Sequence, residues 1–450
     1  MRYYFVSLGC PKNAVDAECM GHLLDVAGHE PVFDPQQADV LLVNTCGFIE
    51  SARAESIQVL GDLAEMKTPD QLLLAVGCYA QRDGTALAEL VPGIDGILGT
   101  RRWAEIVSVV DQLGRRSPES APLTMTGEAT CATPQQVHRT AVQGSSAYLK
   151  IADGCSAACA YCAIPLIKGP LHSRPVSAVL ADAQEMARRG VQEIILIAQD
   201  TTAYGRDRGE RDALADLLEG LVAAVPEVPW IRIMYAYPQH ITPRLIETMA
   251  HHPQICPYID LPLQHAHPDT LRRMRRPDEP KRVRRLIADL RKAMPEVALR
   301  TAFIVGYPGE TEAEFRALLN FVQRTRFDKV GVFTYSPEPG TAAHDLPGRV
   351  PEPVKQERYD RLMAAQQPIS LAQNESQIGR ILDVLVEGQG EAEYEGEEGI
   401  EVAPISIGRS YRDAPEIDGL VLIEDTVEPG QIVSVEITGA FEYDLVGVLA

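Results

Sequence analysis

The sequence predicts an α/β protein in three parts: an N-terminal parallel α/β domain, a central partial (βα)6 barrel and a small C-terminal antiparallel β-barrel. Three patterns lead to this prediction. Apolar strand-like runs alternate with helix-like stretches over the first 115 residues, as in a parallel sheet with right-handed crossovers. Six further strand–helix units follow. The last 75 residues hold short alternating runs separated by turn signals.

Residues 1–115 form the predicted N-terminal domain. Its apolar strands read YYFVSLGC, DVLLVNTC and LLLAVGC, and each ends on a cysteine: Cys10, Cys46 and Cys78. Helices are expected between them, at about residues 15–27 and 49–65. Because the carboxyl ends of parallel strands share one edge of a sheet, where open α/β folds bind ligands, we expect these three cysteines to converge in space.

Residues 116–140 are rich in Ser, Pro, Thr and Gln and predict a linker, and the central domain then spans residues 141–373. Its strands read AYLKIADGC, EIILIAQD, WIRIMYAY, YIDLPLQ, ALRTAFIVGY and KVGVFTYS. Helices are expected at about residues 178–189, 212–225, 269–274, 281–294 and 312–325. A barrel of this kind carries its active site at the carboxyl ends of its strands, where the first strand leads into a cysteine-rich loop.

Residues 376–446 form the predicted β-barrel, with strands ILDVLVEG, GLVLIED, QIVSVEITG and YDLVGVL. The net charge of the chain is −21, and most of the excess lies after residue 375, where 17 acidic residues stand against three arginines and no lysine. Such a segment, with a formal charge of about −14, repels phosphate backbones and suits a basic partner. Acidic surfaces also aid solubility, so charge alone leaves both interpretations open.

The composition is that of a globular protein, with 45% apolar and 23% charged residues. No apolar run approaches the ~18 residues of a membrane span, and the N-terminus lacks the charged-then-apolar layout of a targeting signal. We therefore expect a cytoplasmic protein without a targeting segment or a membrane partner. Nine cysteines in 450 residues are too sparse for a secreted disulfide scaffold, and clustered cysteines in a reducing compartment indicate metal ligands or catalytic thiols.

The clearest motif is DGCSAACAYCAIP, which spaces Cys155, Cys159 and Cys162 as C-x3-C-x2-C. A tight loop with this spacing brings three thiolates onto three corners of a cubane iron–sulfur cluster. A zinc site normally takes a fourth protein ligand, and the nearest candidate, His172, lies outside the usual finger spacing. With three protein ligands, one iron keeps an open position at which a bound molecule can react.

CSAACAYC at the end of a first barrel strand resembles the radical S-adenosylmethionine (SAM) enzymes. SLGCPKNAVDAE, VNTCGFIESA and VGCYAQR ahead of it, with the β tail behind, resemble the methylthiotransferases over nearly the whole chain. The resemblance implies two [4Fe-4S] clusters with one open iron each: an auxiliary cluster on Cys10, Cys46 and Cys78, and a SAM cluster in a radical SAM core. It also implies SAM as both radical source and methyl donor, and a C-terminal substrate-binding TRAM domain.

One branch of that family modifies an adenosine of tRNA, and the other the β-carbon of an aspartate in ribosomal protein twelve of the small subunit. LIAQDTTAYGRD, LPLQHAHPDTLRRMRRP, FIVGYPGETEAEF and GRSYRDAPEIDG resemble the ribosomal-protein branch. The implied partners are that basic protein, free or on the ribosome, and an external one-electron donor such as a flavodoxin or ferredoxin. The acidic tail independently disfavours tRNA.

Two other functions compete with this one. A tRNA adenosine methylthiotransferase would carry the same clusters, so the substrate alone distinguishes it. A non-catalytic iron–sulfur electron-transfer protein would ligate its clusters fully, and three cysteines per site argue against it.

Further candidate residues carry weaker signals. Tyr161, Gln199 and Gly306 are candidate SAM-binding residues, although Tyr161 suits a core and Gly306 a turn equally well. Asp200 ends a barrel strand and is a candidate contact of SAM or substrate. Ser156, Ala157 and Ala158 replace the polar residues common in the cysteine motif, which affects loop contacts but not ligation.

The remaining candidates have a structural interpretation beside a functional one. His265 lies near a strand end, where a site residue and a hydrogen-bonded core histidine are both expected. The basic run 272–276 suits a solvated helix face or a contact with ribosomal RNA. Packed cysteines without a site role are expected at Cys19, Cys131 and Cys256.

Overall fold

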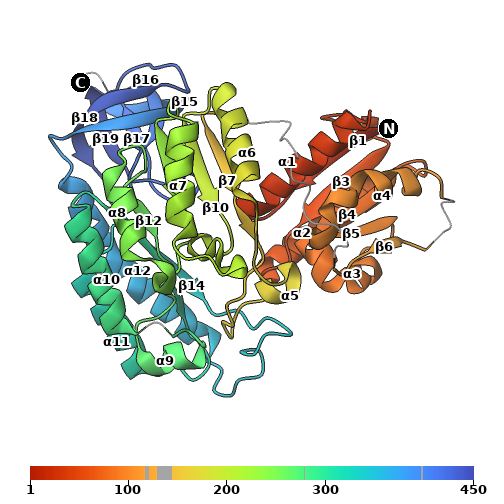
Figure 1. Cartoon of the computed structure of the whole chain (residues 1–450), viewed down its shortest axis with the longest axis horizontal. Coiled ribbons are helices and arrows are strands. Elements are labelled where there is room, and N and C mark those ends of the chain that lie inside the picture. The colour runs from red at the N-terminus through yellow and green to blue at the C-terminus, as the bar shows by residue number, and fades with distance from the viewer. Residues whose placement is uncertain (117–120, 129–143, 278, 397–398) are drawn as a thin grey trace.

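The structure, a computed structural model, describes residues 1–116, 121–128, 144–277, 279–396 and 399–450, and gives the backbone alone for residues 393–396 and 399–401. Three parts follow one another along the chain (Figure 1). The N-terminal sheet and the C-terminal barrel, red to orange and blue in the figure, lie on different sides of the central strands. None of the helices described is both long and apolar enough to cross a membrane.

The N-terminal sheet has six parallel strands in the order β2-β1-β3-β4-β5-β6. The strands are β1 (Arg2–Ser7), β2 (Glu30–Pro31), β3 (Val40–Thr45), β4 (Leu72–Gly77), β5 (Gly96–Gly99) and β6 (Leu123–Met125). The helices are α1 (Pro11–Val26), α2 (Glu50–Met66), α3 (Cys78–Leu90) and α4 (Ile106–Leu113). The predicted strands and both predicted helices are present. β3 and β4 are buried throughout or nearly so, which explains why they read as continuous apolar runs.

The linker prediction is wrong for one stretch. β6, at Leu123–Met125, lies inside the predicted linker 116–140 and pairs with β5 as the edge strand of the sheet. Its three residues, Leu-Thr-Met, are too few to show a period against the surrounding Ser and Pro, and only the neighbouring strand holds them extended. The sheet therefore continues beyond the predicted boundary at residue 115. Most of the remaining linker, including Cys131, lies outside the described residues.

The central domain is an open barrel of six parallel strands in chain order, β7-β10-β11 and β12-β13-β14. A parallel bridge between Ile231 and Ile255 joins the two halves, and the Ala236 N–H donates to the Asp260 carbonyl at 2.8 Å. The strands are β7 (Ser146–Lys150), β10 (Glu193–Ile197), β11 (Trp230–Ile233), β12 (Tyr258–Asp260), β13 (Ala298–Val305) and β14 (Lys329–Thr334), with a small pair β8 (Ala152–Asp153) and β9 (His172–Ser173). The six predicted strands are all confirmed.

The helices of this domain cover the strands from outside (Figure 1). They are α5 (Ile164–Lys168), α6 (Val176–Arg188), α7 (Ala213–Ala224), α8 (Pro243–His251), α9 (Pro268–Arg273), α10 (Pro280–Ala293), α11 (Glu312–Thr325) and α12 (Glu352–Glu375). Five 3-10 turns complete the two domains: Pro35–Gln37, Thr100–Glu105, Thr201–Ala203, Arg206–Arg208 and Pro238–His240. α12 was not predicted because its buried face carries Lys355, Arg358, Gln366 and Asn374, which conceal the apolar period.

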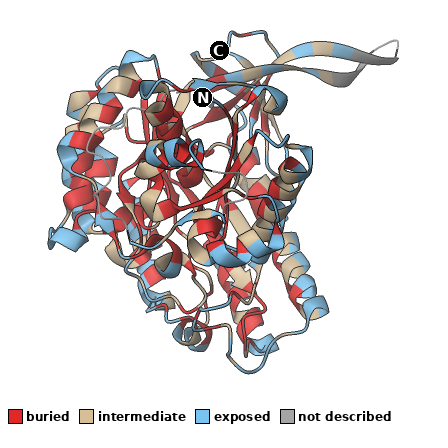
Figure 2. Cartoon of the chain, turned by 90° about the vertical axis from the view of Figure 1, so that its right-hand side faces the viewer, coloured by how far each residue is buried: buried red, intermediate tan, exposed pale blue. Residues whose placement is uncertain are grey.

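The last part is a closed five-stranded barrel in the order β15-β16-β17-β19-β18. Its strands are β15 (Ile381–Gly396), β16 (Gly399–Ser410), β17 (Val421–Ile423), β18 (Ile432–Ala440) and β19 (Leu445–Leu449). The pairing is antiparallel except between β17 and β19, which run parallel. β16 was not predicted. Beyond the barrel, β15 and β16 pair only with each other and project as a two-stranded arm (Figure 2).

The segment between β16 and β17 docks the C-terminal barrel onto the amino-terminal end of the central strands. Glu193, the first residue of β10, receives ion pairs from Arg232 at 2.6 Å and Arg409 at 2.7 Å, and all three side chains are essentially inaccessible. Asp413 pairs with Lys329 at 2.7 Å. Asp418 accepts a hydrogen bond from the Tyr258 hydroxyl at 2.6 Å. Part of the acidic tail thus neutralises the central domain and does not face a partner.

We expect Glu193→Gln to destabilise the protein strongly. Burial alone would raise the pKa of Glu193, but Arg232 and Arg409 outweigh it and lower the pKa to about 2. The substitution leaves the buried Arg232 guanidinium without its anion and Arg409 with Glu387 alone, at a cost of about 3–5 kcal/mol. Urea unfolding should show a clearly lower midpoint, whereas Glu185→Gln, which breaks exposed ion pairs, should cost less than about 1 kcal/mol.

The pH dependence has a defined sign. Because the folded pKa of Glu193 is depressed from 4.5 to about 2, its stabilisation is present above pH 4.5 and is lost as the pH falls toward 2. The gap between wild type and Glu193→Gln should narrow over that window. A gap independent of pH, or equal losses in both variants, would contradict this account.

Candidate active site between two cysteine triplets

The first triplet assembles where three neighbouring strands end. β1, β3 and β4 are adjacent in the sheet. Cys10 precedes the first turn of α1, Cys46 directly follows β3, and Cys78 opens α3. The strands thus end one to three residues earlier than predicted, and the cysteines occupy the turns beyond them. The predicted convergence is nevertheless present at the expected edge.

Asn13 ties the three turns together. Its side-chain N–H groups donate to the carbonyls of Leu8 and Thr45, both at 3.2 Å. Its amide oxygen accepts from the Cys78 thiol at 3.2 Å. The turns also approach closely: a Cβ at Gly9, whose φ is +91°, would lie 2.9 Å from the Cβ of Cys46. A residue other than glycine there would push the Cys10 and Cys46 turns apart.

The second triplet lies on one loop that follows β8. The Cys155 N–H donates to the Gly169 carbonyl at 3.0 Å, and the Ala160 N–H to the Met274 carbonyl at 2.9 Å. Within the loop, the N–H groups of Ala157 and Ile164 point at the sulfurs of Cys155 and Cys162, both at 3.4 Å. Backbone N–H groups aimed at sulfur stabilise a thiolate and tune a bound cluster.

In neither triplet do all three sulfurs lie within 4.8 Å of one another. Among the described residues, only His267, Asp269 and Glu314 place three potential ligand atoms within 4.8 Å of one another. Thiolates that share one tetrahedral Zn2+ at ~2.3 Å would lie about 3.8 Å apart and meet that limit. A cubane cluster holds each thiolate on a separate iron, which keeps the sulfurs further apart.

Thiol acidity also fits a site that requires a metal group. Burial raises the pKa of the Cys78 and Cys162 thiols to about 12, and it raises the pKa of Cys46 and Cys155 as well. These thiols stay protonated at neutral pH unless a positively charged group draws the protons off. An iron–sulfur cluster supplies that charge, so the residues present fit the group.

The two triplets belong to one region. Cys78 packs against Ala163, the residue after Cys162, and against Ile167 of α5. Arg101, from the N-terminal domain, donates to the α5 carbonyls of Ile167 and Leu166, both at 2.9 Å. The N-terminal domain therefore contacts the end of the second cysteine loop.

The N-terminal domain also closes the open side of the barrel. α1 packs along β7, the first barrel strand. Arg82 reaches Glu338, just beyond the last strand β14, at 3.0 Å, and Arg53 pairs with the same carboxylate. The cysteine edge of the sheet is thereby held against the carboxyl ends of the barrel strands.

A buried charge network that the sequence analysis did not identify lies at this junction. Asp16 pairs with Lys150 and, at 2.7 Å, with Lys168. Asp153 pairs with Lys150 at 2.7 Å. Burial would raise the pKa of Asp153, but the two lysines outweigh it and lower the pKa. Asp153 stands two residues before Cys155, and that position was the available signal.

Lys12 is a different kind of buried cation. Its side chain is 94% buried, and its ammonium lies 3.2 Å from the centroid of the Tyr235 ring, beyond β11. Burial lowers the pKa of Lys12 to about 8. Within the described part of the chain, no carboxylate comes within ion-pair distance of this ammonium. In the sequence, the position of Lys12 two residues after Cys10 is the signal that could have indicated a role at this site.

The candidate SAM-binding residues have mixed surroundings. Tyr161 packs on a small apolar cluster with Met274 and Tyr307. Gln199 lies partly buried just beyond β10. Gly306 has φ +72°, and a Cβ there would collide with Lys355, so a turn requires this glycine whatever else it contacts. The Asp200 carboxylate accepts from the Ala203 N–H at 3.1 Å and lies 2.8 Å from His240 Nδ1, which gives it a structural role.

His265 is a hydrogen-bonded core histidine. Its Nδ1 accepts from the His267 N–H at 3.0 Å, so Nε2 carries the proton and donates to Glu310 at 3.1 Å. Cys19 and Cys256 are packed in the apolar core, as expected. His172, weighed as a fourth metal ligand, is exposed on β9.

Comparison with known proteins follows this three-part architecture. Residues 2–99 match the uncharacterized protein family UPF0004, residues 149–322 the radical SAM superfamily, and residues 378–449 the TRAM domain. A curated relative from Chloroflexus aurantiacus, named ribosomal protein uS12 methylthiotransferase RimO, is 50% identical over 99% of both chains. A relative of the same name from Roseiflexus sp. strain RS-1 is 49% identical over 99% of this chain and 97% of its own.

The chain belongs to the RimO family of radical SAM methylthiotransferases. Solved structures support the fold alone. The radical SAM methyltransferase TsrM from Kitasatospora setae aligns with a TM-score of 0.57 at 13% identity, over 88% of this chain and 79% of its own. The cobalamin-dependent radical SAM enzyme OxsB aligns with a TM-score of 0.54 at 12% identity, over 82% of this chain and 56% of its own.

We expect Cys78→Ala to remove one cluster and leave the other. Anaerobically purified protein should lose about four iron and four sulfide ions per chain, the content of one cubane cluster. Cys256→Ala is the matched control, because Cys256 is also buried but lies just before β12, at the amino-terminal end of the barrel strands and not at their carboxyl ends. Unchanged iron in Cys78→Ala, or equal losses in the two variants, would contradict the ligand assignment.

Proposed function

We propose that this protein transfers a methylthio group to the β-carbon of an aspartate in ribosomal protein uS12. The observation that carries the proposal is the meeting of two three-cysteine sites at one junction between the N-terminal sheet and the barrel. A single-cluster enzyme needs no second triplet, and an electron carrier needs no open ligand position. Membership of the RimO family, whose named members act on uS12, supports the choice of substrate.

In this proposal Cys155, Cys159 and Cys162 hold the SAM cluster, and Cys10, Cys46 and Cys78 hold the auxiliary cluster. When bound, the clusters and SAM supply the radical that takes a hydrogen atom from the substrate and the methylated sulfur that replaces it. An external one-electron donor such as a flavodoxin or ferredoxin completes the reaction. Since the substrate is a ribosomal protein, we propose the cytoplasm as the place of action.

Lys12 suits the recognition of the aspartate carboxylate. A buried ammonium without an anion costs free energy that an incoming carboxylate would recover. Lys150 and Lys168 are already paired with Asp16 and Asp153. Among the lysines that the structure describes at this junction, Lys12 is the one without an ion pair, and its charge can meet a substrate carboxylate. A carboxylate bound there lies beside the Cys10 turn. The β-carbon, bonded to that carboxyl group, is then held close to the auxiliary site.

The acidic C-terminal barrel suits a basic substrate protein, with one refinement. Asp413 and Asp418 are used in docking onto the central domain. Four of the 17 acidic residues, Glu391, Glu393, Glu395 and Glu401, lie on the arm formed by β15 and β16. A projecting strand pair with this charge attracts a basic protein and repels a phosphate backbone.

The alternative substrate, an adenosine of tRNA, brings no carboxylate for Lys12 and meets an acidic arm. We expect the enzyme, supplied with SAM and a reductant, to add ~46 Da to the ribosomal protein, the mass of one methylthio group replacing hydrogen. Mass spectrometry of the protein and of tRNA incubated separately decides between the two. A gain on tRNA alone would overturn the proposal.

We expect Lys12→Met to weaken binding of an aspartate substrate peptide by about 1.5–3 kcal/mol, because a charged hydrogen bond is lost. Wild-type enzyme should bind the aspartate peptide more tightly than its asparagine counterpart, and Lys12→Met should bind both alike. Fluorescence titration of the four combinations gives the coupling directly. Iron content should stay unchanged, which separates substrate recognition from cluster loss. A persisting preference for aspartate in Lys12→Met would exclude the role.

A further inference from the structure

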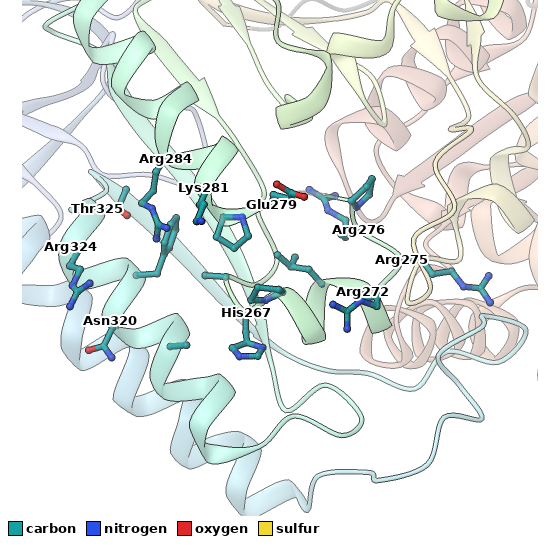
Figure 3. A pocket seen from close by; sticks show the side chains of 17 residues that line it. His267, Arg272, Arg275, Arg276, Glu279, Lys281, Arg284, Asn320, Arg324 and Thr325 are labelled. Atoms are coloured by element: carbon teal, nitrogen blue, oxygen red, sulfur yellow. The ribbon is translucent and has the colours of Figure 1, made fainter.

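A basic groove lies on the outer face of the barrel, between α9, α10 and α11. Its volume is about 1130 Å³. Six cationic side chains line it: Arg272, Arg275, Arg276, Lys281, Arg284 and Arg324. Figure 3 shows these side chains around the hollow, with Glu279 the one acidic side chain labelled there. The chain as a whole carries a net charge of −21, whereas this part of its surface is positively charged.

Four of these cations have no anionic partner within the described chain. Arg275, Lys281, Arg284 and Arg324 are exposed, and no carboxylate described in the structure lies within ion-pair distance of them. Like charges gathered in one hollow repel one another, and an external anion relieves that repulsion. The arrangement contrasts with the surface ion pairs of nearby helices, such as Arg361 with Glu312 at 3.0 Å.

The groove adjoins the proposed active site. Arg276 at its inner end lies over the Tyr237 ring, 4.1 Å from the centroid. Burial raises the pKa of the Cys155 and Cys162 thiols, and the positive charge of Arg276 opposes that rise. The end of α9 also accepts the hydrogen bond from Ala160, inside the cysteine loop, at 2.9 Å. A ligand in the groove therefore sits beside the loop that carries Cys155, Cys159 and Cys162.

We propose that this groove binds the phosphate backbone of the ribosomal RNA that carries the substrate protein. The inference rests on the proposed function, and it implies that the enzyme recognises the ribosomal protein on its RNA. A basic ribosomal protein cannot itself occupy a basic groove, because its charges would be repelled. A series of phosphates spaced along a strand matches several separated cations better than one small anion does.

The charge pattern of the whole molecule agrees with a composite substrate. The acidic arm of β15 and β16 suits the basic protein, and the groove suits the polyanion on which that protein is assembled. The acidic arm would repel RNA, and the basic groove would repel the basic protein. Together, the two surfaces favour a protein–RNA particle bound in one orientation.

The test compares two charge reversals on the same helix. Lys281→Glu with Arg284→Glu changes two groove residues of α10. Arg282→Glu with Arg285→Glu makes the same change in charge on α10, at exposed positions that do not line the groove. Both are made in the full-length protein with its clusters, and iron content checks that both remain loaded.

Two assays follow. A fluorescent transcript of the small-subunit ribosomal RNA is titrated at several salt concentrations. The groove variant should bind at least tenfold more weakly, and its salt slope should be shallower by about two, one for each lost phosphate contact. Methylthiolation is then measured on small ribosomal subunits that lack the modification and on the free protein. The groove variant should lose at least tenfold in kcat/KM on subunits and keep its activity on free protein, and the control should resemble wild type.

Every other pattern overturns the inference. Equal losses in the groove and control variants would indicate a general effect of net charge. Unchanged RNA affinity with slower cluster reduction by flavodoxin would assign the groove to an acidic electron carrier. Failure of the wild type to modify free protein or subunits would reject the proposed function instead, and the RNA titration would still decide whether the groove binds RNA.

Discussion

Asp16 is the residue on which the arrangement of the two sites depends. Its carboxylate, buried in α1, pairs with Lys150 of β7 and with Lys168 of α5. α1 begins at the Cys10 turn, β7 leads toward the second cysteine loop, and α5 follows that loop. One buried anion thus joins the helix that begins at Cys10 to both elements that flank the loop carrying Cys155, Cys159 and Cys162. Without it, Asp153 alone would be left to balance two buried lysines at the domain junction.

Much of this arrangement follows from local rules that a single sequence reveals. The convergence of Cys10, Cys46 and Cys78 was predictable because neighbouring parallel strands must end on one edge. The six barrel strands were predictable because buried parallel strands are continuous apolar runs. β6, β16 and α12 were not predicted. A single neighbouring strand holds β6 extended, and the polar groups that α12 buries conceal its apolar period.

Long-range polar contacts were also beyond the sequence. Asp153 and Lys12 stand close to cysteines of the two triplets. Nothing in their spacing says that Asp153 forms ion pairs and that Lys12 forms none with the described residues. The tail was counted as −14 from the sequence, and the structure divides that charge. Asp413 and Asp418 serve inside the molecule, whereas further acidic residues stand on the arm in which β15 and β16 pair with each other. Net charge by segment therefore predicts a partner only after internal pairs are removed.

The contact between Glu193 and Arg409, which joins the central domain to the C-terminal barrel, has a consequence for folding during synthesis. Arg409, one of its two arginine partners, lies 216 residues further along the chain. At a synthesis rate of ~5–20 residues per second, Glu193 waits roughly 10–40 seconds for that partner. During this time the amino-terminal ends of the barrel strands lack the C-terminal barrel that docks onto them, while the described strands of the N-terminal sheet have all been made. The nascent chain can thus complete the domain that carries Cys10, Cys46 and Cys78 well before the C-terminal barrel covers the central domain.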